Sequence, residues 1–241
     1  MATLNTLLQT CSDNDEKLEF MFDSFERIKI KVDEVLTFGA FNSAEVIRAR
    51  NKYVEQMKMA ERNRFFRAHF EEADLQAIPA ILAGYKIFED DSKSITSSPE
   101  LHYEELFKIG YLYGTGTCEI FSIVGAYFMA LEFELDLSLE TLYSDSSHTY
   151  IRVHTNPEYI IDFWGPMLCF YDDTVSWNEF FGQDLLRNEK ATIKKHVTFN
   201  SEQLIQLGHK IFTQDNLAQR SIIHKEINEQ VHFESPSTLS C

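Results

Sequence analysis

The stretch Leu112–Glu132, LYGTGTCEIFSIVGAYFMALE, is the part of the chain from which the fold can best be predicted. Two glycines, Gly114 and Gly116, precede a single cysteine, Cys118, and the residues that follow are apolar enough to form a buried helix. We therefore expect Cys118 at the N-terminus of that helix. Unpaired cysteine is among the most buried residue types, so Cys118 could be a small core residue, or it could be a nucleophile.

A cysteine nucleophile needs a lowered thiol pKa, a nearby base and a group that orients the base. The N-terminus of a helix favours a thiolate and can stabilise an oxyanion. Gly114 and Gly116 permit unusual backbone angles and a close approach of substrate. The local sequence around Cys118 therefore suits a nucleophile, but the base and its orienting group must come from elsewhere.

Two predicted strands supply these groups. The segment HTYIRVH alternates in polarity from His148, and EYIIDFWG is β-branched and aromatic around Asp162. An aspartate among such residues is costly to bury without a partner, and His148 on a neighbouring strand is a natural one. The even separation allows the two to face each other in a hairpin centred on Thr155, with a loop of three or five residues. The alternative is that Asp162 caps a turn or bonds to the backbone.

The segments GTCEIFSIVGAYFMALE, SSHTYIRV and EYIIDFWGP resemble the core of the transglutaminase-like cysteine hydrolases, within the papain-like superfamily. By this resemblance Cys118 is the nucleophile, His148 the general base and Asp162 the orienting acid. The resemblance also implies an oxyanion side chain upstream, for which Tyr113 is the candidate. Further matching positions are Gly116, Ser122, Tyr150, Trp164 and Pro166.

The fold class expected is α+β, with a papain-like, transglutaminase-type core in which the helix that bears the cysteine packs on a small antiparallel sheet. A helical N-terminal lobe is expected over residues 1–92, and the polar stretch DDSKSITSSPE is the candidate linker. The core, with helices at its C-terminal end, is expected over 99–232, and residues 233–241 are expected to be a disordered tail. An N-cap at Ser98 should start the core.

Composition narrows the classes of partner. A net charge of −16 argues against a nucleic-acid partner, which the acidic surface would repel. No apolar run approaches the length of a membrane span, and the N-terminus does not resemble a secretory signal peptide. The four cysteines are scattered and form no C-x-x-C pair, which is typical of a reducing, cytoplasmic compartment. No cofactor is expected. Zinc held by Cys118, His148 and Asp162 is an alternative, although no tight pair of ligands supports it.

The predicted function is acyl transfer or hydrolysis at an amide of a protein substrate, of the protease, glutamine deamidase or transglutaminase type. The competing prediction is an inactive protein–protein interaction module that keeps the fold. The superfamily includes bacterial effectors, and the C-terminal sequence HKEINEQVHFESPSTLSC is reminiscent of an export signal, so the substrate could be a host protein. The sequence makes no prediction of the oligomeric state.

Overall fold

The structure is a computed structural model that describes residues 1–60, 72–91, 98–143, 147–173, 175–176 and 191–234. Its architecture is α+β, as predicted. The helices are α1 (Leu4–Gln9), α2 (Asn14–Val35), α3 (Ala44–Ala60), α4 (Glu72–Asp91), α5 (Pro99–Tyr113), α6 (Cys118–Glu132), α8 (Ser201–Ile211) and α9 (Gln214–Glu234). The strands are β1 (Gly39–Ala40), β2 (Thr115–Gly116), β3 (Asp136–Tyr143), β4 (Ser147–Val153), β5 (Tyr159–Asp162), β6 (Met167–Phe170) and β7 (Thr192–Asn200).

The chain divides into two compact units, each built from three segments. The sheet unit comprises Met1–Val35, Thr96–Lys108 and Cys118–Phe212. The helical unit comprises Leu36–Ile95, Ile109–Thr117 and Thr213–Cys241. This division does not follow the expected boundary between residues 92 and 99, because the apolar stripe of α2 packs on α6 and so joins the N-terminal residues to the sheet unit.

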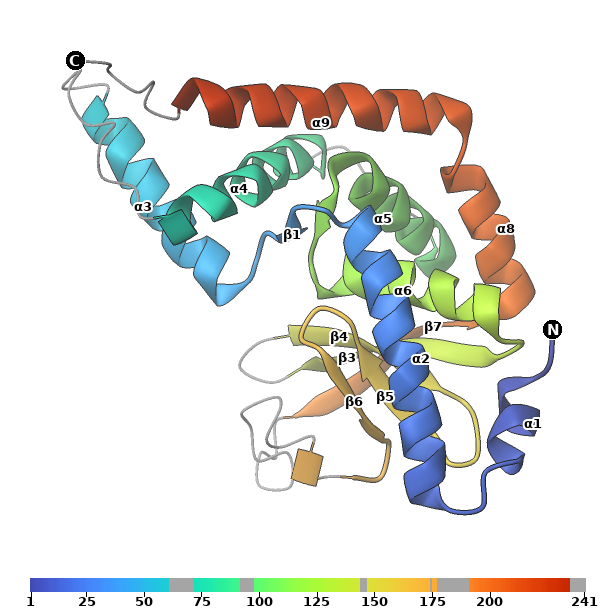
Figure 1. Ribbon diagram of the computed structural model, residues 1–241. Helices are drawn as coiled ribbons and strands as arrows, with labels where there is room; N and C mark the ends of the chain where they lie inside the picture. The colour runs from blue at the N-terminus through green and yellow to red at the C-terminus, as the bar shows by residue number, and fades with distance from the viewer. Residues whose placement is uncertain (61–71, 92–97, 144–146, 174, 177–190, 235–241) are drawn as a thin grey trace. The chain divides into compact units, whose positions relative to one another are not determined.

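A five-stranded antiparallel sheet forms the centre of the sheet unit, in the order β6-β5-β4-β3-β7 (Figure 1). The interior strand β3, between β4 and the edge strand β7, is buried along nearly its whole length, and residues on both of its faces are inaccessible, including the polar Ser138 and Glu140. Helix α6 packs on β4, β3 and β5, and α8 packs on α6. The N-terminus of α6 is thereby fixed against the strands that bear His148 and Asp162.

A close approach at Gly125 sets the packing between α6 and the sheet. A Cβ atom at Gly125 would lie 2.1 Å from Cδ2 of Phe163, the residue after Asp162. The Phe163 ring is 1% exposed and stacks on Phe25 of α2, with ring centroids 5.1 Å apart. The ring therefore has little room to move, and only glycine fits at this position of the helix.

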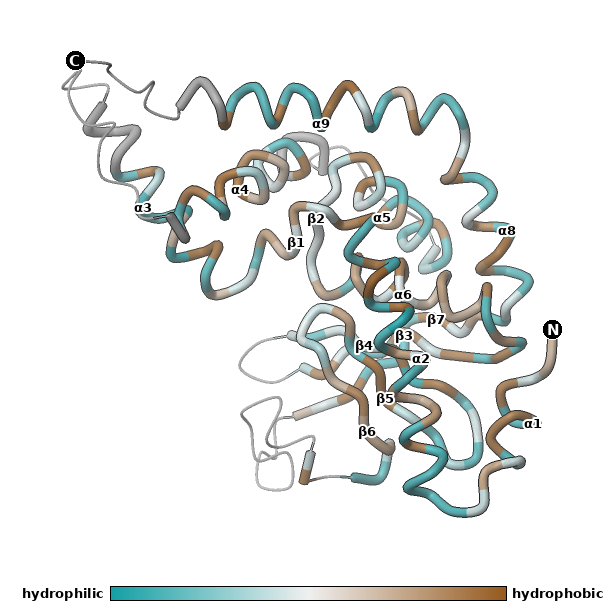
Figure 2. The backbone as a smooth tube through the Cα atoms, in the orientation of Figure 1, coloured by the Kyte–Doolittle hydropathy of each residue, from teal (hydrophilic) through white to brown (hydrophobic). Residues whose placement is uncertain are grey.

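The helical unit holds the glycine-rich residues that precede Cys118. Thr115 and Gly116 form β2, which pairs in parallel with β1, and the Thr115 hydroxyl donates to the Gly39 carbonyl at 2.6 Å. Gly114 has a φ of +66°, a conformation that favours glycine. In the same unit, α4 packs on α3 and α9. Hydrophilic residues predominate along α9, where Ile223 and Ile227 are buried (Figure 2).

Three helical stretches can be compared with what their sequences predict. The proline inside the apolar stretch LQAIPAILAGYKIF predicts a kinked or broken helix, and the helix there, α4, is not broken at Pro79, because its buried apolar side chains offset the lost backbone bond. Helical patterns are expected from Ser201 to about Val231, and two helices, α8 and α9, lie there; the Thr213 hydroxyl accepts from the Asn216 backbone N–H at the start of α9. Helix α5 ends at Tyr113 rather than near Gly110.

Other predictions fall outside the described residues. They are the linker over residues 92–97, the end of the second helix near residue 69, a helix at about 177–186, and the tail from residue 235. Within the described part of the chain, no helix is long and apolar enough to cross a membrane.

The predicted cap at the start of α5 is confirmed. The Ser98 hydroxyl accepts from the Leu101 N–H at 3.3 Å, and Pro99 is the first residue of α5.

Candidate active site

Cys118 is the first residue of α6, at the position that the sequence predicts. Its thiol forms no disulfide, and the residue is 9% exposed, so it is mostly buried but retains some contact with solvent. The first backbone N–H groups of a helix have no partner within the helix, and Cys118 belongs to this first turn of α6. These groups can stabilise negative charge that develops beside the cysteine.

The structure brings His148 and Asp162 together. Nε2 of His148, on β4, lies 2.6 Å from Oδ2 of Asp162, the last residue of β5. The Asp162 carboxylate is fully buried, and the His148 side chain is 15% exposed. Because Nε2 faces Asp162, Nδ1 is the ring nitrogen that remains for the Cys118 thiol, which lies close enough to His148 to raise the pKa of the imidazole.

The register that produces this pair differs from the predicted one. Ile151 pairs with Ile161 and Val153 with Tyr159, so the hairpin is centred on Asn156 and not on Thr155. The loop is five residues long, 154–158, and its length agrees with the prediction. The shift makes His148 and Asp162 diagonal neighbours on one face, a separation that the long histidine side chain spans.

The remaining oxygen of Asp162 is also occupied. Oδ1 accepts the backbone N–H of Trp164 at 2.9 Å, so the carboxylate bonds to the turn after β5 as well as to His148. The two predicted roles of Asp162 are therefore compatible and both are present. The Trp164 ring packs against the His148 imidazole with centroids 5.2 Å apart, which restricts the imidazole further.

These contacts decide the charge of His148. Burial alone would lower its pKa, but the hydrogen bonds to Asp162 and Cys118, together with their negative charges, raise the pKa of His148 to about 9. At neutral pH the imidazole is therefore protonated. An imidazolium beside a thiol favours the thiolate, which is the reactive form of cysteine.

A second hydrogen-bond network ties α6 to the strand that bears His148. The Ser122 hydroxyl, one turn after Cys118, donates to the Thr149 carbonyl at 3.2 Å. The Thr149 and Thr141 hydroxyls lie 2.7 Å apart, and Thr141 is hydrogen-bonded to Nε2 of His196 at 2.7 Å. Ser122 is one of the positions on which the family resemblance rests, and here it fixes the distance between the cysteine helix and β4.

Other candidate residues have different environments. Cys169 is buried on β6, where burial raises the pKa of its thiol to about 12, so it is a core residue as predicted. Tyr113, the candidate for the oxyanion side chain, belongs to the helical unit and packs against its apolar cluster of Phe41, Ala80 and Ile87. Tyr150 is buried and donates to Glu140 at 3.2 Å.

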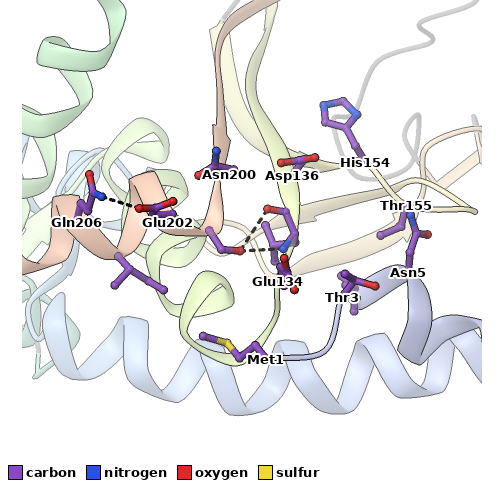
Figure 3. A pocket seen from close by; sticks show the side chains of 14 residues that line it. Met1, Thr3, Asn5, Glu134, Asp136, His154, Thr155, Asn200, Glu202 and Gln206 are labelled. Carbon is purple, nitrogen blue, oxygen red and sulfur yellow. Dashed lines mark hydrogen bonds between the residues drawn. The ribbon is translucent and has the colours of Figure 1, made fainter.

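His154 lies in the loop of the hairpin, with its side chain 30% exposed, at the opposite end of β4 from His148. Its ring lies 2.5 Å from the Ser138 hydroxyl and 2.9 Å from the Glu158 carboxylate. It also lines a cavity of about 820 Å³ beside Asp136, Glu134 and the start of α8 (Figure 3). Cys118, His148 and Asp162 do not line this cavity, so its size does not bear on their chemistry.

No family model, curated protein or solved structure that we compared matches the chain. Among the described residues, no group of three or more histidine, cysteine, aspartate or glutamate side chains is arranged to hold a metal ion. The geometry of Cys118, His148 and Asp162 is therefore the observation from which a function must be argued.

Proposed function

We propose that the protein is a cysteine-dependent enzyme that transfers or hydrolyses the acyl group of an amide in a protein substrate. The observation that supports this most strongly is the hydrogen bond between His148 and the fully buried Asp162 beside the Cys118 thiol, an arrangement that keeps His148 protonated. If Cys118 were only a core residue, the fold would gain nothing from burying a carboxylate and a charged imidazole beside it, because burial of charged groups is costly.

The reaction proceeds in two halves. The Cys118 thiolate attacks the amide carbonyl carbon, a sulfur–carbon bond forms, and the carbon–nitrogen bond breaks as His148 gives its proton to the departing amine. Water or an amine then attacks the thioester and loses a proton to His148, and the thiolate leaves. Throughout, Asp162 keeps the imidazole oriented and stabilises its charge.

The protease, deamidase and transglutaminase reactions share the first half and differ in the leaving group and in the final acceptor. Our proposal therefore covers acyl transfer at an amide. A thiolate enzyme operates where cysteines stay reduced, and Cys11, Cys118 and Cys169 are all free thiols. We propose a cytoplasmic or other reducing environment on this basis, including that of a host cell if the protein is exported.

The test is acylation by an activated ester. With p-nitrophenyl acetate, the wild-type chain should release a burst of nitrophenolate equal to the amount of chain, with the acetyl group on the peptide that contains Cys118. Cys118→Ala should remove the burst, and His148→Ala should slow it by about 10²-fold or more. Acetylation spread over several cysteines at similar rates would instead favour the interaction module.

A further inference from the structure

A buried tyrosine hydroxyl in the sheet unit has no hydrogen-bond partner among the described residues. Tyr103 of α5 is 1% exposed, and among the described residues its hydroxyl has no hydrogen-bond partner. A buried hydroxyl without a partner costs about 1–3 kcal/mol. Such groups are uncommon in folded proteins, and each one calls for an explanation.

The contacts of Tyr103 connect it, through His196 and Thr141, to the strand that bears His148. Its ring packs against His196, with centroids 6.4 Å apart, and His196 bonds to Thr141. Thr141 bonds in turn to Thr149, the residue after His148. Tyr103 therefore packs on the network that ties the cysteine helix to the histidine strand.

The hydroxyl itself lies close enough to Cys118 to sense its charge. Burial, followed by the negative charges of Glu119 and Cys118, raises the pKa of Tyr103. The phenol is consequently protonated at neutral pH. Its O–H is a buried hydrogen-bond donor that has no acceptor among the described residues.

We propose that Tyr103 is a catalytic residue whose hydroxyl donates to the oxyanion formed when Cys118 attacks the carbonyl. This rests on the proposed function. As the sulfur–carbon bond forms, the carbonyl π electrons move to oxygen, and that oxygen accepts from the Tyr103 O–H and from backbone N–H groups at the start of α6. The intermediate collapses when the carbon–nitrogen bond breaks and the amine takes the proton of His148, so Tyr103 keeps its own proton throughout.

An unpartnered donor suits this role physically. Because it makes no hydrogen bond in the free enzyme, none has to be broken when the oxyanion forms, and its interaction is gained in the transition state. Removal of one such donor slows acyl transfer by about 10²–10³-fold in enzymes with a preorganised site. Tyr103 could not be predicted from its local pattern, since it lies in an ordinary helical stretch, ELHYEELF.

The experiment compares two reactions of the same thiol. Acylation by p-nitrophenyl acetate passes through an oxyanion, whereas alkylation by iodoacetamide is a direct displacement at carbon and forms none. Tyr103→Phe should therefore slow acylation by about 10²-fold or more while Cys118 alkylation changes by less than about twofold. Site-specific 3-fluorotyrosine at position 103, which keeps the hydroxyl, should preserve fast acylation.

Tyr159→Phe is the matched control. Tyr159 is also fully buried in the sheet unit with an unpartnered hydroxyl, but the thiol that raises its pKa is Cys11, not Cys118. Tyr159→Phe should leave both reactions unchanged. Acylation by Tyr103→Phe at the wild-type rate, or an equal loss of acylation and alkylation, would overturn the role of Tyr103 alone. Absence of any burst from wild type would overturn the proposed function and this role together.

Discussion

Asp162→Asn should slow acylation of Cys118 by about 10²–10⁴-fold, a loss comparable to that caused by the equivalent change in serine protease triads. The reason lies in the two bonds of Asp162, because both of its oxygens accept: one faces Nε2 of His148 and the other the Trp164 N–H. An asparagine has one acceptor oxygen and one donor nitrogen, so it cannot satisfy both partners.

Each orientation of the amide has a cost. If the asparagine oxygen accepts from Trp164, its NH₂ group faces Nε2 of His148 and forces the proton onto Nδ1, which is the wrong tautomer for a base toward Cys118. If the oxygen faces His148 instead, two buried donors meet at Trp164, at a cost of about 1–3 kcal/mol. Either way the imidazolium loses a full negative charge as its partner.

The control for this variant is Asp173→Asn. Asp173 also accepts a backbone N–H, from Ser176 at 3.2 Å, but it follows β6 and is not one of the three residues of the candidate site. Asp173→Asn should acylate at the wild-type rate, as measured by the nitrophenolate burst. Equal rates for wild type and Asp162→Asn would show that Asp162 is only a structural residue of the turn.

Gly125→Ala should destabilise the chain and also impair the site. The new Cβ atom would lie 2.1 Å and 2.4 Å from two ring atoms of Phe163, and stacking on Phe25 prevents the ring from retreating freely. Overpacking of this kind costs about 1–3 kcal/mol, which the better helix propensity of alanine offsets by less than about 1 kcal/mol. Displacement of Phe163 also moves its neighbour Asp162, so acylation should slow in the folded fraction.

Gly208→Ala provides the comparison. Its Cβ atom would lie 2.0 Å from Cε2 of Tyr127, which is a similar clash between α8 and α6 that does not involve Phe163 or Asp162. Both variants should lower the melting temperature by a few degrees in a thermal scan, since about 1 kcal/mol corresponds to about 2–4 °C at this size. Only Gly125→Ala should slow acylation. An equal loss of acylation rate in Gly208→Ala would mean that reduced stability of the fold, and not displacement of Asp162, causes the effect.

The elements that bear the site could be predicted because each carries a distinct local pattern. Cys118 follows glycines and starts an apolar helix, while Asp162 is out of place among β-branched and aromatic residues. The predicted positions of Cys118, His148 and Asp162 on a helix start and two strands are confirmed. The chemistry that these positions support remains a proposal.

Strands β3, β6 and β7 were not predicted. In β3 the polar residues Ser138, Glu140 and Thr141 are buried because neighbouring strands and side chains satisfy them, so alternation of polarity does not mark its buried face. In β7 the residues Lys194 and Lys195 are exposed on an edge of the sheet, where lysine is common. Such tertiary contacts are not visible in a local pattern.

The register of the hairpin and the role of Tyr103 depend on tertiary structure in the same way. Even spacing placed His148 and Asp162 on one face, but it could not distinguish directly opposed from diagonal neighbours. Tyr103 lies on a helix that the sequence does not connect to the cysteine, and only packing brings it to the network around Thr141.

The central claim is that His148 activates Cys118 as a nucleophile, and the most direct measurement is iodoacetamide alkylation of each cysteine against pH. Ordinary thiols lose about tenfold in rate per pH unit below their pKa of about 8.5. Cys118 should instead stay reactive at about pH 6, at least about tenfold faster than Cys11, and the difference should fade as His148 deprotonates near pH 9. His148→Ala should abolish the advantage at low pH. Alkylation of Cys118 no faster than that of Cys11, or unchanged in His148→Ala, would contradict the account.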